Sequence, residues 1–294
     1  MASVKEYACA KINLYLDVLS KREDGFHNVK TVMHTVSLSD EVTVSVCRSD
    51  RPEVRLTIVG HPKLPTDSRN LAVKAAELFL DSTLISASVH IKLVKRIPVA
   101  AGLAGGSTDA AAVLRAMNKA FRRPLTEKRL LAIASELGSD VPYCLLGGTA
   151  LCCGRGERIE RLPDNLKLNT VIAISDEYVS TPFAYAELDR LYADFRSPRA
   201  DNSEDRCRSV RSAAISGETS EMELFNIFEN AILPIYNGAD MLKREMFNLG
   251  AIHALMSGSG PSVFGIFKDR TSAEEARDKL IEQGVRAYYA ETVC

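Results

Sequence analysis

The chain has 294 residues, enough for about two domains of ordinary size. Its 37 basic and 38 acidic residues nearly cancel and leave a formal net charge of −1 at pH 7. This balance excludes a general electrostatic attraction to nucleic acids or to anionic membranes. No run approaches the roughly 20 consecutive apolar residues of a membrane helix, and residues 1–14 lack the apolar core of a signal peptide. We therefore expect a cytoplasmic protein without nucleic-acid or membrane partners.

The seven cysteines are odd in number and show no CxxC spacing. Cys152 and Cys153 are adjacent, which is an awkward geometry for a simple bridge or a metal clip. We expect small, buried thiols in a reducing compartment.

The first half of the chain alternates strand-like and helix-like patterns. Residues 7–19 form an apolar run with few polar interruptions, which predicts a long strand. Further strands are expected where apolar residues alternate with polar ones, at 42–46, 54–58 and 89–93. Helical spacing of apolar residues predicts helices over 70–80, 107–121 and 126–137.

The pattern restarts after a break near residues 155–170. A strand is expected at 170–174 and a helix at 181–192, opened by Pro182. Residues 196–219 are mostly polar and charged, so we expect a mobile loop there. The remaining expected elements are helices at 221–231 and 239–248, a strand–turn–strand at 253–267, a helix at 272–283 and a last short strand. Strands and helices are interleaved without strict βα repeats, which predicts an α+β fold.

A glycine-rich segment, Pro98–Ala112, is the most informative part of the sequence. It contains three glycines followed by Ser107 and Thr108 at the start of an alanine-rich helix. Glycines let the backbone approach a ligand closely, and the free N–H groups of a helix start favour a phosphate. The alternative is an ordinary loop with a Ser/Thr helix cap. Because three glycines and two hydroxyls lie together, we favour an anion site.

Phosphate and catalytic motifs of other enzyme classes are absent from the sequence. GxxxxGK[ST] does not occur, and the stretch GSGPSVFG has Val263 where GxGxxG requires its last glycine. GxSxG and HExxH are also missing. The glycine-rich segment is therefore neither a P-loop nor a dinucleotide fingerprint.

Three further segments have both a functional and a structural interpretation. Asp140, followed closely by Pro142, fits a helix cap. Lys11 interrupts an apolar strand and, taken alone, fits a lysine that points to solvent. The turn Ser257–Pro261 fits either a plain hairpin or the lining of a phosphate site.

Taken together and in this order, the segments resemble the GHMP kinase superfamily (galactose, homoserine, mevalonate and phosphomevalonate kinases). The stretches that carry the resemblance run from about residue 5 to about residue 290. They are Ala10–Leu16, Lys21–His27, Pro98–Thr108, Leu137–Pro142, Gly147–Ala150, Gly154–Glu157 and Ser257–Phe264. The resemblance implies an α+β fold of two domains, the first like domain 2 of ribosomal protein S5 and the second ferredoxin-like. We expect these domains at residues 1–160 and 161–294.

AKINLYL and KREDGFH are most similar to a branch of the superfamily that acts on a diphosphocytidyl sugar alcohol. The implied activity is ATP-dependent phosphorylation of the 2-hydroxyl of this alcohol, in the non-mevalonate isoprenoid precursor pathway. The implied partners are this small molecule and ATP, with Mg²⁺ as the accompanying ion. Such a protein is expected to be a monomer or a homodimer.

The resemblance also implies the site residues. Lys11 and Asp140 are the expected catalytic pair. Asp140 would orient the attacking hydroxyl and accept its proton late in the step, and Lys11 would stabilise charge on the transferring phosphoryl group. These roles suit phosphoryl transfer, because this reaction depends on positioning and electrostatics. The expected ATP-binding residues are Asn70, Leu71, Lys95, Pro98, Val99, Ala100, Ala101, Gly102, Leu103, Ala104, Gly105, Gly106, Ser107 and Thr108. The expected substrate-binding residues are Asn13, Phe26, His27, Thr181 and Tyr185.

Two departures from the family pattern have structural consequences. Phe26 replaces the usual tyrosine, which keeps a stacking face and loses a hydroxyl. Ala100, Ala101 and Ala104 stand where many members have glycine, so we expect negative φ angles there.

Other functions stay open at this point. The chain is alternatively a GHMP kinase for a different alcohol such as mevalonate, or a non-catalytic sensor that binds ATP or a sugar. Both Lys11 and Asp140 are present, which argues against the sensor. Nucleic-acid binding through the S5-like domain is disfavoured by the balanced charge.

Overall fold

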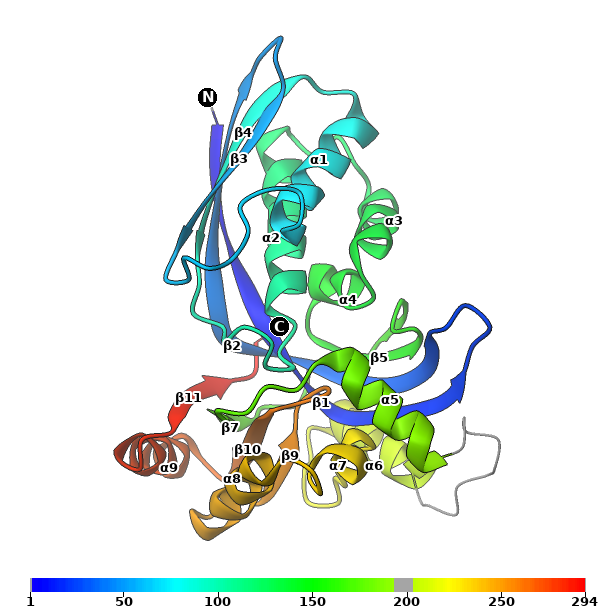
Figure 1. Ribbon diagram of the computed structural model, residues 1–294, viewed down its shortest axis with the longest axis vertical. Helices are drawn as coiled ribbons and strands as arrows, with labels where there is room; N and C mark the ends of the chain where they lie inside the picture. The colour runs from blue at the N-terminus through cyan, green and yellow to red at the C-terminus, as the bar shows by residue number, and fades with distance from the viewer. Residues whose placement is uncertain (1, 193–202, 294) are drawn as a thin grey trace. The chain divides into compact units, whose positions relative to one another are not determined.

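The computed structural model describes residues 2–192 and 203–293, which fold into two compact units (Figure 1). Unit 1 consists of Met1–Ala10, Ser39–Val99 and Ala104–Leu146. Unit 2 consists of Lys11–Leu38, Ala100–Leu103 and Gly147–Cys294. The long strands β1 (Ala2–Lys21) and β2 (His27–Arg48) contribute residues to both units. The division into domains at residues 160 and 161 stays a prediction.

Strands of unit 1 confirm the expected period-two pattern. Strand β4 (Ala87–Val94) pairs antiparallel with the second half of β2 and parallel with β3 (Glu53–Val59). Along β4 every second side chain is buried, because successive side chains of a strand point to opposite faces of the sheet. The alternation in the sequence therefore marks one face that packs on the core.

Four helices complete unit 1, and Figure 1 shows α1, α2 and α3 on the same side of β3 and β4. They are α1 (Leu71–Thr83), α2 (Gly105–Ala120), α3 (Glu127–Leu137) and α4 (Val141–Leu146). Asn70 and Thr126 cap α1 and α3 by accepting hydrogen bonds from backbone N–H groups of the first turn. Ala110, Ala111, Ala112 and Ala116 of α2 are buried, so this helix packs closely on its neighbours.

Unit 2 contains the second half of β1, the first half of β2 and the strands that pair with them. Strand β5 (Thr149–Gly154) pairs antiparallel with β2 and with β6 (Arg158–Arg161). The two-residue strand β8 (Phe225–Asn226) pairs parallel with β1 through Tyr15 and Leu16.

A separate four-stranded antiparallel sheet forms the rest of unit 2. Its strands are β7 (Asn169–Ile174), β9 (His253–Met256), β10 (Ser262–Phe267) and β11 (Arg286–Glu291). Their spatial order is β11-β7-β10-β9, which is the ferredoxin-like order of a split βαβ fold. Helices α8 (Asn237–Asn248) and α9 (Arg270–Glu282) pack on this sheet over a core of aliphatic side chains.

Helix α5 (Thr181–Tyr192) has the predicted bounds, but the expectation of a mobile loop over 196–219 is wrong in part. Residues 203–216 form α6 (Ser203–Ser216), and residues 196–202 lie outside the described residues. Cys207, Val210 and Ala214 recur at helical spacing and are buried. This narrow apolar stripe folds the segment despite its many charges.

The prediction of a helix over 221–231 is also wrong. Only α7 (Phe228–Ile232) is helical, and it follows β8 directly. The Asn226 side chain accepts a hydrogen bond from the Phe228 backbone N–H, which opens the short helix. Pairing of β8 with β1 therefore replaces the first turns of the expected helix.

None of the helices that the structure describes has the length and apolar composition needed to span a bilayer. The six cysteines within the described residues are free thiols. Cys144, Cys152 and Cys207 are buried as expected, whereas Cys9 and Cys153 are half-buried and the expectation is wrong for Cys47, which is exposed.

Candidate functional site

Lys11 lies at the centre of a buried hydrogen-bond network in unit 2. It projects from β1 with 4% of its surface exposed, so the interpretation as a solvent-facing lysine is wrong. Its Nζ donates to Asn13 Oδ1 at 2.6 Å and to the Gly102 carbonyl oxygen at 2.8 Å. These two oxygens hold the buried ammonium group in a defined position.

Gly102 must be glycine for steric reasons. Its φ is +71°, and a Cβ atom built there would lie 2.0 Å from the Ser257 carbonyl oxygen. The Ser257 hydroxyl donates to the Gly102 carbonyl oxygen at 3.1 Å. The glycine-rich segment and the turn between β9 and β10 therefore meet at Gly102, beside the Lys11 ammonium group. This turn is a hairpin, as expected, but it also completes the Lys11 network.

Asn13 joins the three parts of this network. Its Oδ1 accepts hydrogen bonds from Lys11 and from the Gly258 backbone N–H at 3.0 Å, and its Nδ2 donates to Thr31 Oγ1 at 2.9 Å. The Thr31 hydroxyl donates in turn to the Tyr15 carbonyl oxygen at 2.6 Å. Asn13 therefore fixes the position of Lys11, and its expected contact with substrate stays a prediction.

Two residues that support this network were missed from the sequence. Asn226 Nδ2 donates to the carbonyl oxygens of Met256 and Gly258 at 2.7 and 2.8 Å. Glu229 Oε1 accepts from the Met256 backbone N–H at 2.9 Å. A polar side chain inside the apolar run LFNIF was the available signal, since a buried asparagine requires partners.

The glycine-rich segment begins α2 without a side-chain cap. The N-cap residue is Ala104, no side chain accepts from the first turn, and the Thr108 hydroxyl donates to the Gly105 carbonyl oxygen at 2.9 Å. The alternative interpretation as a Ser/Thr cap is therefore wrong. Backbone N–H groups at this helix start in unit 1 are the kind that bind phosphate.

The expectation of negative φ angles is wrong for Ala100 and Ala104, whose φ values are +55° and +58°, and holds for Ala101. A left-handed alanine costs about 1–2 kcal/mol. Contacts of the residues between them outweigh this cost: the Ser262 hydroxyl donates to the Ala101 carbonyl oxygen, and Gly102 receives two hydrogen bonds. Such strain is concentrated at functional sites in many proteins.

Two expected ATP-binding residues, Leu71 and Lys95, lie near the start of α2, and a third, Asn70, lies at the start of α1. Leu71 Cδ1 lies 3.8 Å from the point where a Cβ of Gly106 would stand. Lys95 is buried in ion pairs with Asp40 and Asp109. Asn70 is the N-cap of α1, so it has a structural role whether or not it contacts ATP.

Asp140 lies in unit 1, directly before α4. Its backbone carbonyl oxygen accepts a hydrogen bond from the Cys144 N–H at 2.9 Å, as at a helix start. This position fits the structural interpretation of Asp140, and its catalytic pairing with Lys11 stays a prediction.

Of the expected substrate-binding residues, His27 and Tyr185 stack on each other in unit 2. Their ring centroids are 4.7 Å apart and their planes differ by 23°. His27 Nε2 lies 2.7 Å from Asp189 Oδ1, and Lys21 Nζ donates to Asp189 Oδ2 at 2.6 Å. Burial opposes ionisation of this carboxyl group, yet the hydrogen bonds from Lys21 and His27 lower the pKa of Asp189.

Phe26 is held outside the core by a structured hairpin loop. The Asp24 carboxylate accepts hydrogen bonds from the Phe26 backbone N–H and from Arg22, and 52% of Phe26 is exposed. The Arg155 guanidinium lies 4.9 Å from its ring centroid. Phe26 is therefore not a core residue. The remaining substrate candidate, Thr181, exchanges a hydrogen bond with Ser259 at 3.0 Å.

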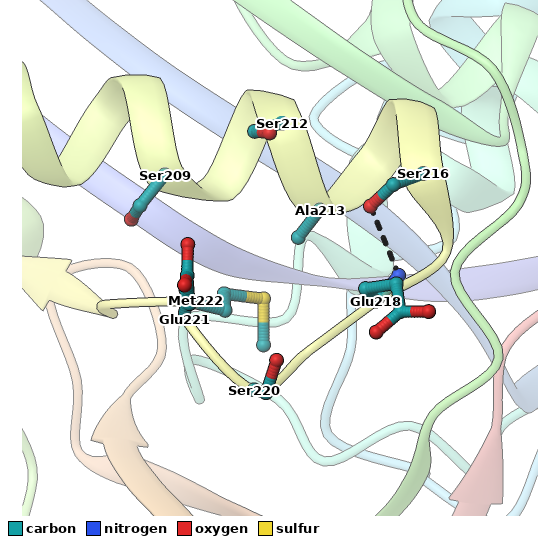
Figure 2. A pocket seen from close by; sticks show the side chains of 8 residues that line it. All are labelled: Ser209, Ser212, Ala213, Ser216, Glu218, Ser220, Glu221 and Met222. Atoms are coloured by element: carbon teal, nitrogen blue, oxygen red, sulfur yellow. Dashed lines mark hydrogen bonds between the residues drawn. The ribbon is translucent and has the colours of Figure 1, made fainter.

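A hollow of about 230 Å³ lies elsewhere in unit 2, between α6 and the segment that follows it. Figure 2 shows its serine-rich lining, with a hydrogen bond from the Glu218 N–H to Ser216 Oγ. It contains no residue predicted from the sequence to act in catalysis or binding.

Two family models match the chain. One is described as "GHMP kinases N terminal domain" and covers residues 70–148; the other is "GHMP kinases C terminal" and covers residues 215–286. The 4-diphosphocytidyl-2-C-methyl-D-erythritol kinase of Gloeobacter violaceus is 41% identical over 297 residues, which cover 99% of this chain and 95% of that protein. The chain belongs to the GHMP kinases.

Other GHMP kinases agree with this assignment. The enzyme of the same name from Caldicellulosiruptor bescii is 40% identical over 279 residues, covering 94% of each protein. A crystal structure of 4-(cytidine 5'-diphospho)-2C-methyl-D-erythritol kinase is 31% identical, covers 99% of this chain and 100% of its own, and has a TM-score of 0.81. Homoserine kinase from Cytophaga hutchinsonii, at 22% identity and a TM-score of 0.77, shares the fold.

Membership confirms the expected two-domain α+β fold and an ATP-dependent kinase activity. Kinases of this family use ATP, generally with a divalent metal ion. Among the residues that the structure describes, no group of three or more His, Cys, Asp and Glu side chains is arranged to hold a metal.

Proposed function

We propose that this GHMP kinase transfers the γ-phosphoryl group of ATP to the 2-hydroxyl of 4-diphosphocytidyl-2-C-methyl-D-erythritol. The observation that carries the proposal is the similarity of about 40% over nearly the whole chain to kinases of that name. Full-length similarity includes the hairpin loop KREDGFH, in which the substrate-specific residues are expected. The pathway is then that of a non-mevalonate isoprenoid precursor.

Recognition of the cytosine base is assigned to Phe26, His27 and Tyr185. Phe26 offers a ring that is half exposed although its loop is well ordered by hydrogen bonds, which suits stacking on a base. His27 is proposed to hydrogen-bond the edge of the base, with its ring held in place by the contact between Nε2 and Asp189. Asn13 and Thr181 are the further residues proposed for substrate.

ATP phosphates are proposed to bind at the start of α2. Residues 98–108 bring backbone N–H groups to an uncapped helix start, where the helix dipole favours an anion. A Cβ atom built on Gly105 would lie 3.1 Å from Ile97 Cγ2, so a larger side chain at residue 105 would crowd this turn. Asn70, Leu71 and Lys95 are proposed to complete the nucleotide site.

Lys11 and Asp140 are proposed as the catalytic pair. The substrate hydroxyl oxygen attacks the γ-phosphorus, the bond to the β,γ-bridging oxygen breaks, ADP leaves, and the hydroxyl proton passes to Asp140 late in the step. Lys11, fixed by Asn13 and the Gly102 carbonyl oxygen, would stabilise negative charge on the phosphoryl oxygens.

Mg²⁺ is proposed to enter with ATP. An ion bound with a nucleotide needs only one or two protein carboxylates, since phosphates and water supply the other ligands. Bound with ATP, Mg²⁺ would neutralise charge on the β- and γ-phosphates. Domains at 1–160 and 161–294, a cytoplasmic location, and a monomeric or homodimeric state belong to the same proposal.

The substrate assignment is tested by ADP release from purified protein with Mg-ATP and one alcohol at a time. The panel contains diphosphocytidyl-methylerythritol, mevalonate, homoserine and galactose. We expect turnover with the first alone. Turnover with mevalonate instead would assign the chain to another GHMP activity, and ATP binding without turnover on any alcohol would favour a sensor.

The catalytic pair is tested by Asp140→Asn and Lys11→Ala. Each variant should lose roughly 10²–10⁴-fold in turnover or more, with the fold intact. Near-normal turnover of Asp140→Asn would leave Asp140 as a residue of the helix start alone, and so would a lowered melting temperature without a separate catalytic loss.

A further inference from the structure

A buried cluster of three charged side chains lies in unit 1, next to the start of α2. Lys95 Nζ donates to Asp40 Oδ2 and, at 2.7 Å, to Asp109 Oδ2. The exposed fractions of the three side chains are 5% for Lys95, 0% for Asp40 and 5% for Asp109. One ammonium group therefore faces two carboxyl groups away from solvent.

The cluster joins the chain before the glycine-rich segment to the helix after it. Asp40 Oδ1 accepts hydrogen bonds from the backbone N–H groups of Arg96 and Ile97, the latter at 2.8 Å. Asp109 belongs to the beginning of α2. Lys95 Nζ lies 3.4 Å from the point where a Cβ of Gly105 would stand, so it lies against the first residue of that helix.

These partners leave one oxygen of the buried Asp109 carboxyl group without a hydrogen bond. Its Oδ1 atom is buried and has no hydrogen-bond partner among the described residues. Burial is the main reason that the pKa of Asp109 is raised to about 7, Asp40 contributes to the rise, and Lys95 opposes it. An incompletely paired buried carboxyl group lowers stability relative to an apolar or amide side chain of similar size. Its presence here requires a reason other than stability.

We propose that Asp109 is a positioning residue for ATP. Through Lys95 and Asp40 it holds the first turn of α2 in register with residues 95–97, so that the N–H groups at the helix start keep the geometry that phosphate needs. The inference rests on the proposed phosphate site and assigns to Asp109 and Asp40 a role beyond it. The hydrogen bond from Lys95 Nζ to Asp109 also keeps the Lys95 side chain against Gly105.

The test is Asp109→Asn, which keeps the side-chain shape and removes the charge. Glu6→Gln is the matched control, because Glu6 forms ion pairs with Arg115 and Lys119 further along the same helix. Dissociation constants for ATP and for diphosphocytidyl-methylerythritol are measured by calorimetry, together with the denaturant midpoint. We expect Asp109→Asn to weaken ATP about tenfold, with the alcohol affinity unchanged and the midpoint equal or higher. Glu6→Gln should leave ATP affinity unchanged.

Unchanged ATP affinity in Asp109→Asn would overturn the inference, and so would an equal loss for both ligands that follows a lowered midpoint. The wild-type measurement separates this outcome from failure of the proposed function. If the wild type binds ATP but not diphosphocytidyl-methylerythritol, the proposed substrate is wrong while the comparison of ATP affinities still decides the role of Asp109.

Discussion

Replacing Phe26 by alanine should weaken the diphosphocytidyl substrate and leave ATP affinity nearly unchanged. Stacking of an aromatic side chain on a base is worth about 1–3 kcal/mol, so the substrate dissociation constant should rise roughly ten- to a hundredfold. Truncation of a fully buried phenylalanine costs roughly 3–5 kcal/mol of stability. Because 52% of Phe26 is exposed, the free energy of unfolding should fall by no more than about half of that.

The assay measures both dissociation constants and the denaturant midpoint on one variant. Phe247→Ala is a matched control, since Phe247 on α8 is 48% exposed and belongs to no proposed site. The control should lose a similar amount of stability and no substrate affinity. Equal weakening of both ligands in Phe26→Ala, in proportion to a lowered midpoint, would refute a role in base stacking.

Three further predictions follow from local geometry. Gly102→Ala should abolish turnover and lower the melting temperature, because its Cβ would lie 2.0 Å from the Ser257 carbonyl oxygen; an active, stable variant would contradict the observed backbone. Ala104→Gly should raise the free energy of unfolding by up to about 1 kcal/mol in denaturant titrations, since it relieves a positive φ, whereas a loss would indicate an unstrained alanine. His34 is buried with its pKa lowered to about 4 from 6.5, so its unfolded form binds more protons between these values. The contribution of neutral His34 to the free energy of unfolding should be complete above about pH 6.5 and should decline, by roughly 3 kcal/mol in total, as the pH falls to about 4. Measuring the free energy of unfolding of wild type and His34→Gln over this range isolates the contribution of His34. Parallel pH profiles of the two proteins would refute the prediction.

Local patterns in the sequence predicted most of the fold. Alternation found β3 and β4, and helical spacing with capping residues found α1 and α3, because these signals depend only on neighbours along the chain. The short helix α7 was misjudged, since Asn226 bonds to residues 30 and more positions away and β8 pairs with β1. Charged residues obscured the narrow apolar stripe of α6.

The residues of the candidate site were proposed from sequence motifs, whereas their contacts depend on the fold and could not be predicted. Lys11 was selected because AKINLYL resembles a family motif, while its burial depends on Gly102 and Asn13, which only the fold brings together. The left-handed conformation of Ala104 contradicts the preference of alanine, since long-range contacts of the segment outweigh a cost of about 1–2 kcal/mol. Asp109 gave no signal in the sequence, because its partners Lys95 and Asp40 are distant along the chain.

The central claim, transfer of phosphate to the 2-hydroxyl of a diphosphocytidyl sugar alcohol, is tested most directly by the ³¹P NMR spectrum of the product. The carbon that bears this hydroxyl also bears the methyl group and therefore no hydrogen. A proton-coupled spectrum should show one new phosphomonoester resonance without splitting by a carbinol proton, beside an intact diphosphate. A new resonance split into a doublet or a triplet would place the phosphate on a different hydroxyl, and a spectrum without a new phosphomonoester would contradict the activity itself.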